Sequence, residues 1–242
     1  MTALVVVLAL VGVVGLYRTF AGPAGVGHFR SAQDRQEYLG YYQQVMETMP
    51  APSQVEDVIT SYGTVRVYTW ESGAGRDSPP VVLLPGRASG APMWAVNIPL
   101  LIQSRRVIAF DALGDAGMSV QSAPLTSADD QAAWVDEVLA DVAPDGVHLV
   151  GHSFGGATAA LYARIHPERV RSLTLLEAVF VFAYPPADIM GWTVVSSIPA
   201  LPEGWRNKAL ERIGGEKLSG TDPMELMIKA GAEKFDASLP TP

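Results

Sequence analysis

The stretch VHLVGHSFGGATAALYAR, from Val147 to Arg164, decides the fold that this sequence predicts. A β-branched run leads into Gly-His-Ser-Phe-Gly, and a run of small residues typical of a helix follows directly. Ser153 therefore falls in a tight turn between a strand and a helix, the setting that separates a nucleophilic G-x-S-x-G turn from a chance match. Gly151 and Gly155 lack a Cβ atom, so the strand and the helix can approach closely. The alternative is a glycine-bounded turn with an incidental serine, and the strand–helix setting favours the nucleophile.

The same turn predicts a site for a developing negative charge. A helix that begins at Ser153 presents free backbone N–H groups and the positive end of its dipole to an oxyanion. The N–H of Phe154 is the first expected donor. The second is expected from the loop after the apolar strand PPVVLLPG, where Arg87 supplies the backbone N–H.

Composition limits the classes of function. The chain has 242 residues, of which 48% are hydrophobic and 17% charged, as in one large α/β domain. A net charge of −8 without a cluster of Lys and Arg argues against a nucleic-acid partner. The chain has no cysteine, and its four histidines show no metal-ligand spacing. We expect neither a metal nor an organic cofactor.

The N-terminus has a different character. The run ALVVVLALVGVVGL, Ala3 to Leu16, is entirely apolar, and no charged side chain precedes Arg18. As a helix, residues 1–20 would span roughly 30 Å, one hydrocarbon thickness, so we expect a membrane anchor. Arg18 and Arg30 favour a body on the cytoplasmic side. A cleaved secretory signal with a secreted body, or a buried segment, are the alternatives, although the basic region of a signal is missing.

The remaining sequence alternates between strand and helix patterns. Residues 21–50 form a linker and an amphipathic helix, and two β-rich runs hinged at Gly63 predict a hairpin. The helix that follows Ser127 carries a capping box with Asp130. Strands are expected at PPVVLLPG, RRVIAFD, GVHLV and SLTLLEAV, with helices between them. This alternation predicts an α/β fold with a doubly wound, mostly parallel sheet.

From about Phe29 to its end, the chain resembles the α/β-hydrolase superfamily. It is most similar to bacterial carboxylesterase-like members with an N-terminal hydrophobic anchor. The segments that carry the resemblance are FRSAQDRQEYLGYYQQVMETMP, LLPGRASGAPMWAVN, DALGDAGMS, GHSFGG and HPERVRSLTLLEA. The resemblance implies an acyl nucleophile at Ser153 and a small-molecule ester or related acyl substrate. It also implies a hydrolase core over residues 51–179 and a helical lid over residues 180–242.

Two loops near the serine contain Pro85 and the pair Asp111 and Asp115. Pro85 stands where the family usually has a histidine before the glycine of the oxyanion loop. The expected donor lies two residues further on, at Arg87, so Pro85 alters the loop's shape more than its donors. Asp111 and Asp115 match a family loop that is mostly structural, and we do not expect Asp111 in a catalytic triad.

The general base is the missing element. The family places its acid and its histidine after strands seven and eight, but no histidine follows His166 here, and we interpret the chain as C-terminally truncated. His166 lies thirteen residues along the helix from the serine, about 20 Å away. We expect His152 to pack beside the turn and His148 to be a buried core histidine, while His28 belongs to the linker. None of the four suits the base, which must lie near 3 Å from its proton.

Glu177, at the end of the sixth strand, is a candidate acid, because some superfamily members carry the acid there. The alternative is a simple strand-end carboxylate. Without strands seven and eight, the run SLTLLEAV becomes an apolar edge strand unless the lid covers it.

Three interpretations remain open. The first is a membrane-tethered carboxylesterase with an incomplete triad in this chain. The second is a non-catalytic hydrolase-fold module that binds an ester-like ligand or a partner, and the third is a site completed by another chain. A serine nucleophile disfavours dehalogenases and epoxide hydrolases. It leaves thioesterase, lactonase, C–C hydrolase and cofactor-free peroxidase chemistry open. Apolar lid residues fit either a hydrophobic substrate group or packing onto the core.

Overall fold

The computed structural model describes residues 25–73, 78–198, 200–215 and 217–240. The expected membrane anchor, residues 1–20, lies outside these ranges. Within the described part of the chain, no helix combines the length and the apolarity needed to cross a bilayer.

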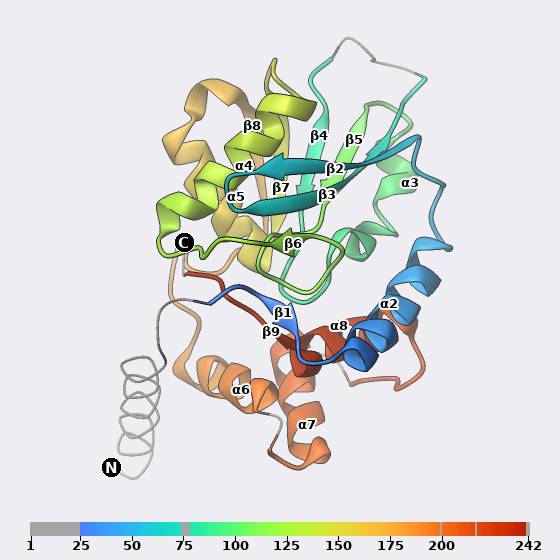
Figure 1. Cartoon of the computed structure of the whole chain (residues 1–242), viewed down its shortest axis with the longest axis vertical. Coiled ribbons are helices and arrows are strands. Elements are labelled where there is room, and N and C mark those ends of the chain that lie inside the picture. Colours follow the sequence, from blue (N-terminus) through green and yellow to red (C-terminus); the bar gives the residue numbers. More distant parts are fainter. Residues whose placement is uncertain (1–24, 74–77, 199, 216, 241–242) are drawn as a thin grey trace.

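The centre of the molecule is a twisted, mixed sheet (Figure 1). Its strands follow the order β2-β3-β5-β4-β7-β8, and the short strand β6 pairs with β3. Strands β5, β4, β7 and β8 run parallel, whereas β2 and β3 form an antiparallel hairpin that turns at Gly63. The predicted hairpin and mostly parallel sheet are therefore confirmed. The strands are β2 (Gln54–Thr60), β3 (Gly63–Trp70), β4 (Val81–Leu84), β5 (Val107–Phe110), β6 (Val120–Gln121), β7 (Val147–His152) and β8 (Val170–Leu176).

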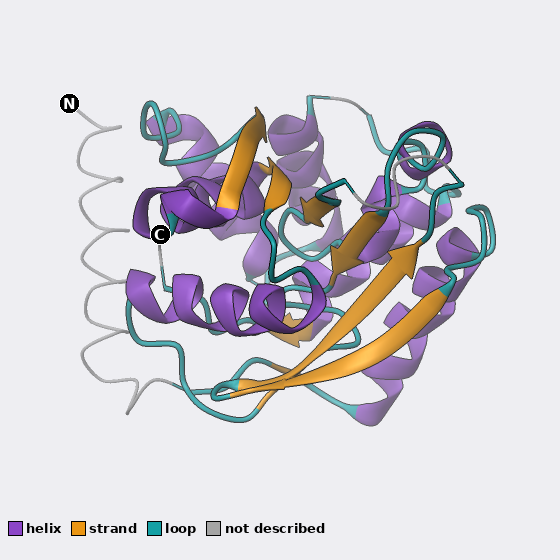
Figure 2. Ribbon diagram, turned by 90° about the horizontal axis from the view of Figure 1, so that it is seen from above, coloured by secondary structure: helices purple, strands orange, loops and turns teal. Residues whose placement is uncertain are grey.

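Helices cover both faces of this sheet (Figures 1 and 2). Strand β4 shows how both faces are buried, because its successive side chains point to opposite faces of the sheet. Val82 and Leu84 belong to the core cluster that contains Trp134, whereas Leu83 belongs to the cluster that contains Tyr38. A strand buried on both faces reads as a continuous apolar run, as VVLL does. Helices α4 (Ala128–Val142) and α5 (Ser153–Ile165) cover one face, and α2 (Ala32–Met46), η1 (Ala91–Trp94) and α3 (Ile98–Leu101) lie on the other.

The predicted capping box at Ser127 is confirmed, and two other helices also begin with a side-chain cap. The Ser127 side chain accepts the Asp130 N–H, and the Asp130 carboxylate accepts the Ser127 N–H in return, which completes the capping box of α4. Ser31 caps α2 and Asp222 caps α8 (Pro223–Lys234) through the N–H groups that a first helical turn leaves unpaired.

The C-terminal helices divide into two groups. Helices α6 (Ala187–Ser197) and α7 (Glu203–Gly214) pack against each other at one end of the molecule (Figure 1). Helix α8 packs against α2 instead, and its Met227 is fully buried in the core. Strand β9 (Phe235–Asp236) then pairs with β1 (His28–Phe29), and the Ser238 N–H donates to Gly114 O. The segment after residue 223 is therefore packed onto the body of the molecule.

Strand β8 ends the sheet. On its outer side no strand follows within the described residues. Leu173 is 38% exposed and Leu176 is 39% exposed, because α6 and α7 do not cover them. The expected apolar edge strand is present in the structure.

Candidate active site

Ser153 lies where β7 gives way to α5, the turn that the sequence predicts. Its φ is +52°, in the left-handed region, where a residue with a Cβ atom is strained. Such strain persists only where surrounding contacts hold the backbone, and it is frequent at active-site residues. The serine is therefore fixed at the start of α5, where backbone N–H groups lack intrahelical acceptors.

The glycines around Ser153 are required by close contact. A Cβ atom on Gly155 would lie 2.6 Å from Leu84 O and closer still to Pro85 O. A Cβ atom on Gly151 would lie 2.7 Å from the Gly155 carbonyl carbon. Strand β4, strand β7 and helix α5 thus meet at a separation that only glycine allows.

The loop after β4 packs directly on the turn that contains Ser153. A Cβ atom on Gly86 would lie 2.8 Å from His152 Nδ1 and 3.4 Å from Ser153 Cβ. The next residue is Arg87, whose backbone N–H forms no hydrogen bond within the part of the chain that the structure describes. The structure therefore brings the loop of Arg87 to Ser153 and Phe154, the two residues that begin α5.

Asp115 holds this loop in place. Its Oδ2 accepts the Ala88 N–H at 2.9 Å and the Arg87 Nε at 3.0 Å, while its Oδ1 accepts the Ala116 N–H at 2.9 Å. Asp115 is only 4% exposed, and Ala88 has a φ of +60°. The Arg87–Asp115 pair was missed in the sequence, because 28 positions separate the partners and no local pattern connects them.

Asp111 is a structural residue, as expected. Its carboxylate is fully buried and accepts the Ala91 N–H at 2.7 Å and the Met118 N–H at 2.6 Å. The Tyr42 hydroxyl also donates to it. Burial, partly offset by these hydrogen bonds, raises the pKa of Asp111 to about 6. The carboxylate fastens η1 and the loop after β5 to α2.

All four histidines lie in the described residues, and none of them forms a hydrogen bond with the Ser153 side chain. His152 packs beside the turn, as predicted, with its Nδ1 buried and without a hydrogen-bond partner among the described residues. Its Nε2 lies 3.7 Å from Glu177 Oε2. The Nδ1 edge of the ring faces Gly86.

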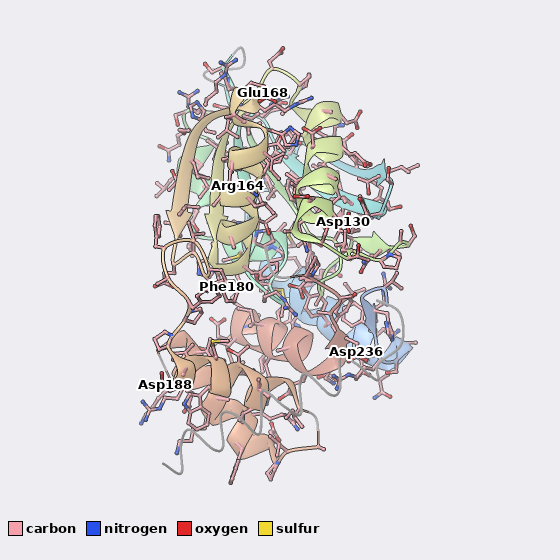
Figure 3. The ribbon with its side chains drawn as sticks, turned by 90° about the vertical axis from the view of Figure 1, so that its left-hand side faces the viewer. Asp130, Arg164, Glu168, Phe180, Asp188 and Asp236 are labelled. Carbon is pink, nitrogen blue, oxygen red and sulfur yellow. The ribbon has the colours of Figure 1, made fainter. Side chains whose placement is uncertain are left out.

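The other three histidines do not lie where a general base for Ser153 would have to be. The prediction of a buried core histidine at His148 is wrong: the residue is partly exposed, and its Nδ1 lies 2.8 Å from Ser172 Oγ. The reason is that β8, its neighbour, is an edge strand. His166 ends α5 near Glu168. Figure 3 shows Arg164 and Glu168 toward one end of the molecule, away from Phe180 and the helices α6 and α7. His28 is exposed on β1.

Glu177 follows β8 with a φ of +48° and a side chain that is 88% exposed. It contacts His152 rather than Ser153. Two residues later, the Val179 N–H donates to Ser153 O at 3.3 Å. The chain after β8 therefore packs onto the turn that contains Ser153, a contact that local sequence patterns do not indicate. No group of three metal-ligating side chains occurs within the described residues.

Comparison with known families decides the classification. The family described as alpha/beta hydrolase fold matches residues 79–213, more than half of the chain. The chain belongs to the α/β-hydrolase fold family. This range includes the β4 loop, the Ser153 turn, helix α6 and all but the last residue of α7.

This α/β-hydrolase is similar to several curated proteins. Carboxylesterase YbfK of Bacillus subtilis (strain 168) is 26% identical over 154 residues, which cover 64% of this chain and 51% of the relative. The 2-hydroxymuconate semialdehyde hydrolase of Pseudomonas sp. (strain CF600) is 37% identical over 118 residues, 46% of this chain and 40% of the relative. The chain thus spans about half the length of the curated relatives that it matches.

A solved structure shows the same fold. Naproxen esterase (carboxylesterase NP) of Bacillus subtilis superposes with a TM-score of 0.73 at 21% identity, covering 88% of this chain and 72% of the esterase. At this level of identity the likeness establishes the arrangement of the chain and not the reaction.

Proposed function

We propose that this α/β-hydrolase is a serine hydrolase that cleaves carboxylic esters through an acyl-enzyme on Ser153. The observation that carries the proposal is the left-handed backbone of Ser153 at the β7–α5 turn, with the Gly86–Arg87 loop packed against it. The carboxylesterase names of similar proteins support the ester bond as the bond that is cleaved.

The reaction follows from this arrangement. The Ser153 Oγ attacks the ester carbonyl carbon, and the carbonyl oxygen becomes an oxyanion that accepts the N–H groups of Arg87 and Phe154. Collapse of this intermediate breaks the ester C–O bond and leaves the acyl group on Ser153, while the departing alkoxide takes up the proton that the Ser153 hydroxyl loses and leaves as the alcohol. Water then attacks the acyl-enzyme, releases the carboxylic acid and restores the hydroxyl.

The rate of ester cleavage depends on how readily the Ser153 hydroxyl loses its proton. Within the described residues, which include all four histidines, no imidazole forms a hydrogen bond with the Ser153 side chain, and on this basis we expect the hydroxyl to attack as a neutral, weak nucleophile. In a serine protease, loss of the triad histidine costs on the order of 10⁶ in kcat, which corresponds to about 8 kcal/mol of barrier. Binding and oxyanion stabilisation alone retain roughly 10³–10⁴ over water. These 242 residues therefore turn over activated esters slowly.

A non-catalytic hydrolase-fold module is the second candidate. The absence of a hydrogen bond between Ser153 and any of the four histidines favours it. In that case Ser153 would bind a ligand's polar group without forming a covalent bond.

Labelling with a fluorophosphonate probe separates the two candidates. The serine hydrolase predicts slow covalent labelling of Ser153, found by peptide mapping and absent from the Ser153→Ala variant. Reversible binding of esters with no adduct at Ser153 after prolonged exposure would instead establish the binding module.

We further propose that residues 1–20 attach the protein to a membrane, with the body on the cytoplasmic side. The apolar run from Ala3 to Leu16 supports this proposal. The full chain should then sediment with membranes, and deletion of residues 1–20 should release the body. Recovery of the full chain with an intact N-terminus in the soluble fraction would refute the anchor, and a mature protein lacking these residues would support the secreted alternative.

A further inference from the structure

The side chain of Arg87 lies over the ring of Phe154, the residue directly after the nucleophile. The guanidinium carbon is 5.7 Å from the ring centroid, within the range of a cation–π contact. The side chain is 47% exposed. A permanently charged group is therefore held, half accessible, over the ring of the residue that follows Ser153 in the sequence.

The position of this guanidinium is fixed before any ligand arrives. Its Nε donates to Asp115 Oδ2 at 3.0 Å, and that carboxylate is itself held by the N–H groups of Ala88 and Ala116. A long side chain normally loses conformational entropy when it binds a ligand, but much of that cost has already been met here. Arg87 is thus preorganised for binding.

Most of its hydrogen-bonding capacity remains unused. A guanidinium carries five N–H donors, and the bond from Nε to Asp115 is the only hydrogen bond of this side chain within the described residues. The terminal nitrogens Nη1 and Nη2 retain four N–H groups. Their planar, forked geometry matches the oxygens of a carboxylate or a phosphate.

The surrounding charges restrict where an anion can bind. The Asp115 carboxylate balances the charge of Arg87, so the binding energy must come from directed N–H bonds rather than from a net positive field. Glu177, whose exposed carboxylate faces His152, repels an anion at the end of β8. An anionic group of a substrate is therefore favoured beside Arg87 and disfavoured beside Glu177.

We propose that the Arg87 side chain selects substrates in which a carboxylate or a phosphate lies a few atoms from the ester carbonyl. This inference rests on the proposed function for the reacting bond, because the Arg87 backbone N–H is the proposed oxyanion donor. The side chain and the backbone of one residue then bind two different oxygens of the same substrate.

Ligand titration of the full chain in detergent micelles, carrying Ser153→Ala to prevent turnover, tests the selectivity. Saturation-transfer NMR gives the affinities for monoethyl glutarate and its neutral counterpart, diethyl glutarate. A second pair, 2-acetoxyethyl phosphate and 2-methoxyethyl acetate, tests the phosphate. We expect the anionic member of at least one pair to bind about tenfold more tightly, as for a hydrogen bond to a charged group.

Additional substitutions identify the residue responsible. Arg87→Gln should abolish the preference, and Arg87→Lys should retain only part of it because the fork is lost. Arg164→Gln, on the exposed end of α5, is the matched control and should keep the preference in full. Circular dichroism establishes that each variant is folded.

The outcomes are distinct. If only the anionic member of the glutarate pair binds more tightly than its neutral counterpart, the group that Arg87 binds is a carboxylate. If only the anionic member of the phosphate pair does so, the group is a phosphate. Equal affinity within both pairs, or a preference that survives Arg87→Gln, overturns the inference. Failure of Ser153 labelling with an Arg87-dependent anion preference intact refutes the proposed reaction and leaves the ligand class standing.

Discussion

The imidazole of His152 and the carboxylate of Glu177 face each other beside Ser153, with Nε2 and Oε2 3.7 Å apart. The register of the sheet explains this contact, because His152 pairs with Leu176 and Glu177 is the next residue. The separation is that of a loose ion pair and is too long for a hydrogen bond. With Glu177 88% exposed, solvent screens the interaction.

Glu177→Gln should therefore have little effect on the site. An exposed pair contributes at most about 1 kcal/mol, so we expect the rate of fluorophosphonate labelling at Ser153 to change by less than about fivefold. Labelling rates of the two proteins under identical conditions provide the measurement. A fall of two orders of magnitude would show that Glu177 serves as the catalytic acid.

Gly155→Ala should destabilise the protein. The new Cβ atom would lie 2.6 Å from Leu84 O, and backbone atoms cannot move aside as a flexible side chain could. We expect a loss of about 3 kcal/mol or more in the free energy of unfolding, measured with urea. The control is Gly191→Ala on α6, where an added Cβ atom would meet no described atom within 4 Å apart from its chain neighbours and its own helix backbone, and where alanine should stabilise the helix by about 0.5–1 kcal/mol. Equal stability of the two variants would contradict the close packing of β4 and α5.

Asp111 should make the protein less stable as the pH rises from about 4 to 6. The folded state retains the proton up to a pKa of about 6, whereas the unfolded state releases it near 3.8, so the folded state binds more protons in this window. The contribution amounts to about 3 kcal/mol lost by pH 7. The free energy of unfolding, measured with urea at pH 4 and at pH 7, should therefore fall less between the two pH values in Asp111→Asn than in the wild type.

The matched control for Asp111 is Asp129→Asn, an exposed carboxylate on α4. It should leave the wild-type difference between the two pH values nearly unchanged. If the free energy of unfolding changed as much between pH 4 and pH 7 in Asp111→Asn as in the wild type, Asp111 would not be the source of the pH dependence.

Aggregation should depend on the edge strand. Leu173→Lys places a charge on the outer strand of the sheet, which opposes pairing with another chain. We expect slower aggregation by light scattering on gentle heating, with little change in stability. Val96→Lys, at a position that is 81% exposed but outside the sheet, is the control and should aggregate like the wild type. The same protection from both variants would attribute aggregation to general apolar exposure.

Much of the fold could be predicted because its signals are local. The alternation of VVLL and VHLV with helical runs, the Gly63 hinge and the Ser127–Asp130 capping box each depend on neighbours in the sequence. The Ser153 turn belongs to the same class, because its glycines stand two residues on either side.

The features that could not be predicted depend on contacts between distant segments. The Arg87–Asp115 pair and the docking of α8 on α2 join residues that no short pattern connects. The exposure of His148 depends on β8 being an edge strand of the sheet among the described residues, which changes the surroundings of a residue that the sequence places in a core strand. Long-range packing, rather than propensity, determines these features.

The most direct test of the account is the rate of Ser153 labelling by a fluorophosphonate as imidazole is added to the intact chain. We expect slow labelling without imidazole and a rise with its concentration, on the order of tenfold, because free imidazole can accept the proton that the Ser153 hydroxyl loses. Ser153→Ala should show no labelling at any concentration. Fast labelling without imidazole that His152→Asn abolishes would contradict the account and identify His152 as the base.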